Sequence, residues 1–252
     1  MKITFLGTGT SIGVPEMLCS CAVCGSENPK DKRLRTSVLI ETGTANILID
    51  CGPDFREQVL RYKVDQIDAV LVTHEHYDHV GGMDDLRPFS FKKSLPVYAE
   101  QFVVEHLMQR IPYCFGSNKY PGTPQLELTE IEAGKVSTVG TSEILPVRVM
   151  HGKLPILGYR IGNMAFITDM KSIDDAEVAK LKGLDLLIVN ALHTKEHPTH
   201  QNLMQAINFA ERVGAKDAWF VHMSHRVGLH NIVDARLPKH IHLAYDGCVL
   251  NI

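Results

Sequence analysis

The sequence lacks an apolar run long enough to cross a membrane. Its opening stretch, MKITFLGTGTSIG, carries one lysine and no apolar core of signal-peptide length. It also lacks an excess of charge, because 26 Lys and Arg residues stand against 29 Asp and Glu residues, for a formal net charge of −3. Without a basic surplus, a surface for binding nucleic acid is not expected. We therefore expect a cytoplasmic protein that binds neither membrane nor nucleic acid.

Low-complexity segments and Pro/Ser-rich linkers are also missing, and 252 residues are enough for one large core. We predict a single domain over 1–252. The chain has six cysteines, and a cytoplasmic location argues against a disulfide framework because thiols stay reduced there. Cys19, Cys21 and Cys24 fall within six residues of one another. That spacing indicates a metal site in a Cys-rich loop around 19–24.

Two segments repeat one pattern of elements. Residues 37–50 and 156–169 each read as a strand, a Gly-containing turn and a second strand, and they end in Asp50 and Asp169. Each hairpin is followed by a predicted helix and then by an apolar strand that leads to a histidine. The recurring β–α units predict an α/β protein, and the acids and histidines at the strand ends suggest a shared site.

Two later segments bear on the site. A helix is predicted over 199–213, with Thr199 as its N-cap and Gly214 as its stop. Residues 111–125 contain too many Pro and Gly residues for regular structure. Their length and aromatic content are typical of an active-site lid or of a surface loop.

The densest group of metal-binding side chains is THEHYDHVGG at 73–82. His74 and His76 lie two apart in an extended segment, so their side chains share one side. Asp78 and His79 follow where the chain turns. Neutral imidazole and ionised carboxylate are the usual ligands of zinc, manganese or iron. One ion rarely takes four ligands from so short a stretch, so the motif predicts two neighbouring divalent ions.

Each ion then needs further ligands from distant strands. Three isolated side chains follow apolar, strand-like runs and are candidates: His151, Asp169 and His222. A carboxylate such as Asp169 can bridge two ions. Histidine and aspartate side chains bind either zinc or manganese, and the metal that is available in the cell often decides which one occupies the site.

The HxHxDH motif with downstream His, Asp and His, together with FLGTGTS and ILIDCG, resembles the metallo-β-lactamase superfamily over essentially the whole chain. The resemblance implies a four-layer αββα sandwich with a dinuclear site at one edge of its two sheets. It assigns the first ion to His74, His76 and His151. It assigns the second ion to Asp78, His79 and His222, with Asp169 bridging. It also implies that Asp50 orients ligands from behind the metal site.

The cysteine triplet adds a closer resemblance, to the PhnP-type phosphodiesterases of this superfamily. A tetrahedral structural zinc needs four ligands. In the PhnP-type group the fourth ligand is a histidine three residues beyond the last catalytic histidine, which corresponds to His225. The resemblance thus implies one structural zinc, held by Cys19, Cys21, Cys24 and His225, beside the two ions of the active site.

The resemblance further implies hydrolysis of a small phosphodiester, and in the PhnP-type group this is a cyclic phosphodiester of ribose, 5-phosphoribosyl 1,2-cyclic phosphate. Two ions can hold a bridging hydroxide for the attack on phosphorus. Asp78 and His200 are the candidate catalytic residues. His200 lies near the start of the predicted helix, where an imidazole can protonate a leaving oxygen. His193 and His197 are weaker candidates, and Arg87, Lys92, Lys93 and Lys153 are candidates to contact a distal phosphate.

Three other functions are compatible with parts of this pattern. An RNase Z-like tRNA 3′ nuclease shares the metal motif, but it needs a long basic arm that the sequence does not contain. A thioester or lactone hydrolase of the same fold is disfavoured by the Cys triplet and by His200. A non-catalytic metal-binding protein is disfavoured by the complete ligand set. The expected partner is the small substrate, and a homodimer is the default oligomer.

Overall fold

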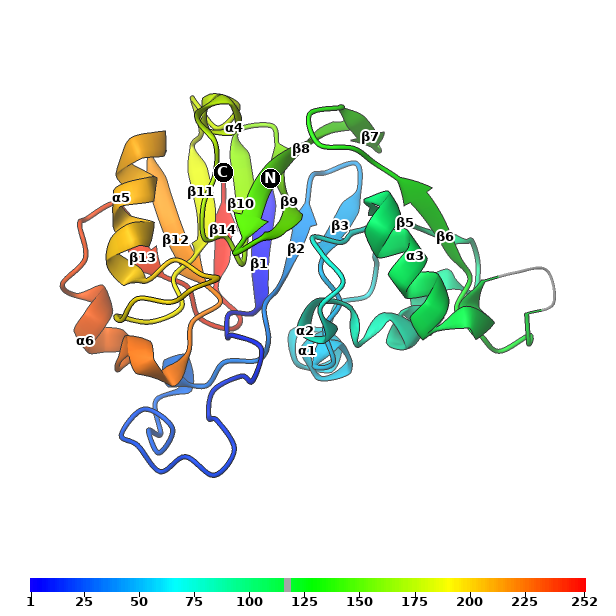
Figure 1. Ribbon diagram of the computed structural model, residues 1–252. Helices are drawn as coiled ribbons and strands as arrows, with labels where there is room; N and C mark the ends of the chain where they lie inside the picture. The colour runs from blue at the N-terminus through cyan, green and yellow to red at the C-terminus, as the bar shows by residue number, and fades with distance from the viewer. Residues whose placement is uncertain (116–118) are drawn as a thin grey trace.

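The computed structural model describes residues 1–115 and 119–252, and these residues form two seven-stranded sheets packed face to face (Figure 1). The first sheet runs in the order β14 (Val249–Asn251), β1 (Lys2–Gly7), β2 (Ser37–Glu41), β3 (Asn46–Ile49), β4 (Ala69–Leu71), β5 (Leu95–Ala99) and β6 (Leu126–Glu130). The second sheet runs in the order β13 (Ile241–Leu243), β12 (Asp217–Val221), β11 (Leu186–Asn190), β10 (Met164–Ile167), β9 (Leu154–Ile161), β8 (Ser142–His151) and β7 (Ser137–Val139).

Helices cover the outer face of each sheet (Figure 1). The first sheet is covered by α1 (Phe55–Tyr62), the 3₁₀ helix η2 (Met83–Ser90) and α3 (Gln101–Arg110). The second is covered by α4 (Asp175–Ala179), α5 (Leu203–Val213) and α6 (His230–Asp234). The short elements are α2 (Tyr77–Val80), η1 (Pro29–Asp31), η3 (Pro112–Cys114) and η4 (His225–Val227). The expected four-layer αββα sandwich is therefore confirmed.

Successive side chains along each strand point to opposite faces of the sheet. In β2, Val38 and Ile40 point into the core between the sheets, whereas Leu39 packs under the helices of the first sheet. In β10, Phe166 lies in the same central core and Ile167 packs under the helices of the second sheet. Because both faces are buried, these strands are continuous apolar runs rather than alternating ones.

The predicted hairpins are confirmed as the pairs β2–β3 and β9–β10. The strand that follows each hairpin pairs in parallel with its second strand, as β3–β4 in the first sheet and β10–β11 in the second. β12 extends the second sheet in parallel beside β11. Parallel strands end at the same edge, so the residues that follow β3, β4, β10, β11 and β12 gather along one side of the sandwich.

The predicted start of the helix over 199–213 is wrong. The helix α5 begins at Leu203, and its N-cap is Asn202 rather than Thr199. The Asn202 side chain accepts from the Gln205 N–H, and the Gln205 side chain accepts in return from the Asn202 N–H, which is a capping box. The predicted stop is confirmed, since Gly214 ends the helix with a φ of 72°. His200 thus lies in the loop before the helix.

The prediction of a lid over 111–125 falls partly on residues 116–118, which lie outside the described residues. In the neighbouring described part, residues 112–114 form the single 3₁₀ turn η3. Among residues 1–115 and 119–252, no helix combines the length and the apolar composition that crossing a bilayer requires.

A buried arginine ties the N-terminal loop to both sheets. The Arg33 guanidinium donates to the Thr8 hydroxyl at 2.8 Å and to the Ala244 carbonyl at 2.6 Å. Thr8 in turn donates to Asp246 at 2.7 Å. Burial lowers the pKa of Arg33 to about 10, against the opposing charge of Asp246, and burial raises the pKa of Asp246 to about 6. Each charge therefore depends on the other to offset its desolvation.

We predict that Arg33→Met lowers the free energy of unfolding by about 3 kcal/mol, because it removes the buried hydrogen bonds to Thr8 and Ala244 and the cation near Asp246. Denaturant unfolding measures this change, with the exposed Arg236→Met as control. The double variant Arg33→Met/Asp246→Asn should recover part of the loss. A cost below about 1 kcal/mol, the range of a surface ion pair, would contradict the prediction.

Candidate metal centre

The structure brings all seven predicted ligands of the active site together at the edge where the parallel strands end. One group of donor atoms comes from His74, His76 and His151. The other comes from Asp78, His79, Asp169 and His222. Within each group the donor atoms lie within 4.8 Å of one another. The two groups are continuous, because the His74 and His79 rings have centroids 4.2 Å apart.

Three residues of this edge adopt a backbone conformation that L-residues rarely take. Asp50, Asp169 and His222 have φ values of 61°, 55° and 55°. Each follows the end of a parallel strand, namely β3, β10 and β12. A left-handed conformation costs a non-glycine residue roughly 1–2 kcal/mol. Such conformations persist where the surroundings fix them, and they cluster at functional sites.

In the first group, hydrogen bonds select the nitrogen that faces the other donors. His151 donates from Nδ1 to the Thr199 carbonyl at 3.0 Å, so its Nε2 keeps a lone pair. Nδ1 of His74 contacts the Thr73 hydroxyl at 2.9 Å, and its Nε2 lies 3.1 Å from Nδ1 of His76. Imidazole nitrogens that converge in this way fit a shared cation, with backbone and hydroxyl groups fixing the rings.

In the second group, imidazole nitrogens face two carboxylates. Nε2 of His79 lies 3.1 Å from Asp78 and 3.3 Å from Asp169. Nε2 of His222 lies 3.4 Å from Asp78 and 3.2 Å from Asp169. Although it is buried, Nε2 of His79 has no hydrogen-bond partner among the described residues. A buried imidazole nitrogen that faces two carboxylates without forming a hydrogen bond to either is well placed to bind a divalent cation.

The pKa directions describe the same balance of charge. Burial alone would raise the pKa of Asp169, but His222 and His79 hold it well below its usual range. Burial alone would lower the pKa of His79, but Asp169, Asp78 and Asp50 hold it well above its usual range. The carboxylates thus favour positive charge at this position, and a divalent cation held here would supply it in place of a proton.

Asp50 lies behind these ligands and is fully buried. Its carboxylate accepts from Nδ1 of His79 at 2.7 Å and from the Thr73 backbone N–H at 2.8 Å. The Thr73 hydroxyl also donates to Asp50, at 2.8 Å, and it contacts His74. Asp50 therefore orients His79 directly and His74 through Thr73. The sequence reasoning missed Thr73, because a threonine before the motif carries no distinguishing feature.

Asn190, which ends β11, was also missed. Its side chain accepts from the Met170 N–H at 2.8 Å and donates to the Met170 carbonyl at 3.1 Å. Met170 directly follows Asp169, so this pair of hydrogen bonds fixes the strained turn at Asp169. An asparagine at the end of an apolar run was the feature of the sequence that indicated this role.

His200 reaches the cluster from the loop before α5. Its Nε2 lies 2.9 Å from Asp169. Its ring centroid lies 4.6 Å from that of His151 and 5.1 Å from that of His222. Burial lowers the pKa of His200 to about 4, although Asp169 opposes the shift. The imidazole is therefore neutral near pH 7 and donates its Nε2–H to Asp169.

The second cluster lies in the loop between β1 and η1, which projects from the lower edge of the molecule in Figure 1. Sγ of Cys19, Cys21 and Cys24 lie 3.3, 3.7 and 3.1 Å from Nδ1 of His225. Nε2 of His225 lies 3.3 Å from the Glu16 carboxylate. Three thiols around one imidazole nitrogen fit a tetrahedral zinc ion.

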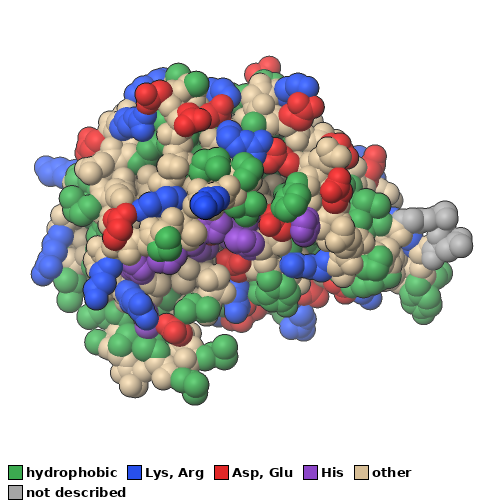
Figure 2. Space-filling model, in the orientation of Figure 1, with side chains coloured by type: hydrophobic (Ala, Val, Ile, Leu, Met, Phe, Trp, Pro, Cys, Tyr) green, Lys and Arg blue, Asp and Glu red, His purple; other side chains and the backbone are tan. Residues whose placement is uncertain are grey.

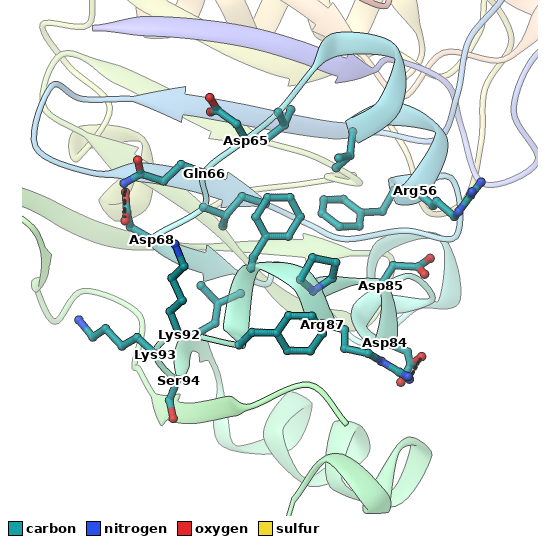
Figure 3. A pocket seen from close by; sticks show the side chains of 18 of the residues that line it. Arg56, Asp65, Gln66, Asp68, Asp84, Asp85, Arg87, Lys92, Lys93 and Ser94 are labelled. Atoms are coloured by element: carbon teal, nitrogen blue, oxygen red, sulfur yellow. Dashed lines mark hydrogen bonds and ion pairs between the residues drawn. The ribbon is translucent and has the colours of Figure 1, made fainter. Parts of the chain in front are cut away.

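A pocket of about 1040 Å³ lies elsewhere, between α1, η2 and the start of β5. Figure 3 shows its aromatic and proline rings surrounded by charged side chains. Arg87, Lys92 and Lys93 line it, and none of the clustered histidines does. These three residues are therefore not part of the metal cluster, and the chemistry is not assigned to this pocket.

The fold and the donor set define a metal-dependent hydrolase, and comparisons with known proteins agree. The chain belongs to the metallo-β-lactamase superfamily, because the family model described as "Beta-lactamase superfamily domain" matches residues 45–223. Among solved structures, a diphosphatase from the PhnP family is 40% identical, with a TM-score of 0.93, over 99% of this chain and 96% of that one. The chain is thus PhnP-like.

Two relatives known by sequence extend this picture. The "Probable metallo-hydrolase YhfI" of Bacillus subtilis is 24% identical over 89% of this chain and 92% of its own length. A Porphyromonas gingivalis protein named "Octanoyltransferase" is 50% identical over 98% of this chain but only 51% of its own length. The chain thus spans about half of that relative, and the name describes a protein with a second, unmatched half.

We predict that Asp50→Asn lowers affinity for the site metal about tenfold or more, since it weakens the partner that orients His79. Metal retained after dialysis against a graded chelator series measures this affinity. The exposed Asp65→Asn is the matched control. Equal metal retention in Asp50→Asn and the wild type would contradict the orienting role.

We predict that Cys21→Ala removes one equivalent of zinc and lowers the melting temperature, because a structural zinc contributes to folding. Elemental analysis and thermal unfolding measure both effects. Ser20→Ala, an exposed neighbour in the same loop, should change neither. Unchanged zinc content and melting in Cys21→Ala would exclude a structural zinc at this loop.

Proposed function

We propose that the chain is a dinuclear phosphodiesterase that hydrolyses a small phosphodiester. The observation that carries this proposal is the placement of two carboxylates, Asp78 and Asp169, against the Nε2 atoms of His79 and His222. Two buried carboxylates whose oxygens lie within 4.8 Å of one another need positive charge beside them, which protonated imidazoles or metal ions can supply. When bound, two neighbouring divalent ions activate water and stabilise the charge that develops on phosphoryl oxygens.

The ligands divide between the two ions according to their contacts. His74, His76 and His151 would hold one ion, and Asp78, His79 and His222 the other. Asp169 touches His79 with one carboxylate oxygen and His222 with the other, which suits a bridging ligand. Zinc and manganese both accept this donor set.

His200 would complete the site from the side of Asp169. Its neutral ring holds a proton on Nε2, 2.9 Å from Asp169. From there the neutral ring can donate a hydrogen bond to a phosphoryl oxygen. To protonate the leaving alkoxide, which is a poor leaving group without a proton donor, the ring would first have to take up a second proton. The His200 side chain is 12% exposed, so this donor lies at the edge of the cluster.

Phosphorus chemistry is supported over acyl chemistry by the similarity to a PhnP-family diphosphatase over nearly the full length of both chains. The Porphyromonas gingivalis relative carries an acyltransferase name, but half of that protein is unmatched. An RNase Z-like activity on tRNA is less well supported, because a chain with a net charge of −3 has no excess of positive charge for binding a polyanion.

The proposed setting is a reducing one. All six cysteines are free, and thiols that serve as zinc ligands survive best where disulfides do not form. We therefore propose a cytoplasmic enzyme in which residues 1–252 form one domain and whose partner is its small substrate, with a homodimer as the default assembly.

We predict that Asp78→Ala lowers kcat by at least about 100-fold while the fold survives, since loss of even an outer partner of a metal site costs about 10–100-fold. The assay uses metal-quantified protein with bis(p-nitrophenyl) phosphate and a cyclic ribose phosphodiester. The exposed Asp65→Ala is the control.

The same panel contains a tRNA precursor and an octanoyl thioester. Turnover of the phosphodiesters that depends on Asp78 supports the proposal. Near-normal turnover in Asp78→Ala, or activity restricted to the thioester or the tRNA precursor, would overturn it.

A further inference from the structure

Three histidines form a line that leads away from the metal cluster. The His200 and His197 rings have centroids 5.0 Å apart, and the His197 and His193 rings have centroids 5.6 Å apart. All three lie in the loop between β11 and α5. His193 is 8% exposed and His197 is partly exposed. The line therefore runs from the buried Asp169 to the partly exposed His197 and on to His193, which is buried.

A backbone contact places the proton of the His193 ring. Nδ1 of His193 accepts from the Lys195 N–H at 3.2 Å. A neutral imidazole that accepts at Nδ1 has its N–H at Nε2. Nδ1 of His197 lies 3.4 Å from the Thr199 nitrogen and 3.2 Å from Nδ1 of His200. Within the described part of the chain, no group is hydrogen-bonded to Nε2 of either ring, so His193 offers an unused donor.

A lysine that is paired with an exposed glutamate lies beside these rings. Lys171 lies close enough to His197 to lower the pKa of that imidazole, after burial and the neighbouring histidines. The Lys171 ammonium contacts Glu196 at 2.5 Å, and the Glu196 side chain is 66% exposed. Figure 2 shows histidine side chains in a band across the middle of one face, with Lys and Arg side chains close to it.

We propose that His193 and His197, together with Lys171, bind a second phosphate group of the substrate and so set its specificity. This inference rests on the proposed phosphodiesterase function. The His193 N–H donor, the neighbouring His197 ring and one ammonium match the acceptor oxygens of a phosphate. His193 is a poor metal ligand, because its Nδ1 lone pair is used and its Nε2 atom carries a proton. The arrangement selects substrates whose second phosphate lies beyond His200.

A matched pair of substrates tests the specificity. Thymidine 5′-(p-nitrophenyl phosphate) and its 3′-phosphorylated form share one scissile bond and one leaving group, and they differ only in a second phosphate. We expect the wild type to have a kcat/KM at least about tenfold higher for the phosphorylated form, the gain typical of a hydrogen bond to a charged group.

The test variant is His193→Asn. An asparagine Oδ1 can still accept from the Lys195 N–H, but the Nε2 donor is lost. We expect the ratio of the two kcat/KM values to fall about tenfold, with most of the change in KM for the phosphorylated form. The matched control is His240→Asn, which replaces a 39% exposed histidine paired with Glu211. It should leave the ratio unchanged.

A binding measurement separates this inference from the proposed function. Calorimetry compares thymidine 3′,5′-bisphosphate with thymidine 5′-monophosphate on metal-loaded wild type and His193→Asn. Tighter bisphosphate binding that is lost in His193→Asn supports the subsite, even if neither diester is hydrolysed and the phosphodiesterase proposal fails. Hydrolysis of both diesters at equal kcat/KM, or a bisphosphate preference that survives in His193→Asn, would overturn the subsite.

Discussion

The buried carboxylate of Asp169 is the constraint on which the rest of the site depends. It is 2% exposed, and it contacts His79, His200 and His222. Asp78 places a second carboxylate against two of the same imidazoles. Negative charges brought together out of water are tolerated only where positive charge is brought with them. The cluster is therefore not a neutral packing arrangement, and its composition already specifies the kind of ligand that it accepts.

The sandwich supplies this cluster through the ends of its parallel strands. β3 and β4 belong to one sheet and β10 and β12 to the other, yet the residues after all four meet at a single edge. The strained turns at Asp50, Asp169 and His222 stand at three of these ends. Backbone hydrogen bonds fix the last of them from the opposite sheet: Met223 donates to the Thr8 carbonyl and accepts from the Thr10 N–H. The geometry of the site is thus a property of both sheets at once.

Much of this could be predicted from the sequence, because the ligand motif is local and the remaining ligands follow recognisable strands. His74, His76, Asp78 and His79 lie within six residues, and the apolar runs before Asp169 and His222 placed both at strand ends. Thr73 and Asn190 were not predictable in this way, because each acts through contacts with a residue that follows another strand. Such contacts depend on tertiary neighbours, which a single sequence does not display. The start of α5 was predictable, because the capping box of Asn202 and Gln205 is a local signature, and the choice of Thr199 overlooked it.

The short segment from His222 to His225 joins the two clusters, which links the stability of the loop to the chemistry of the site. His222 faces Asp169, and His225 faces the three cysteines. Between them, Met223 is fixed by the residues after β1, whose Thr8 is in turn fixed by Arg33 and Asp246. A zinc ion held at the loop would fix one end of this segment while the buried Arg33 network fixes its middle. The Cys-rich loop is thus connected to His222 through this segment, although no cysteine belongs to either group of active-site donors.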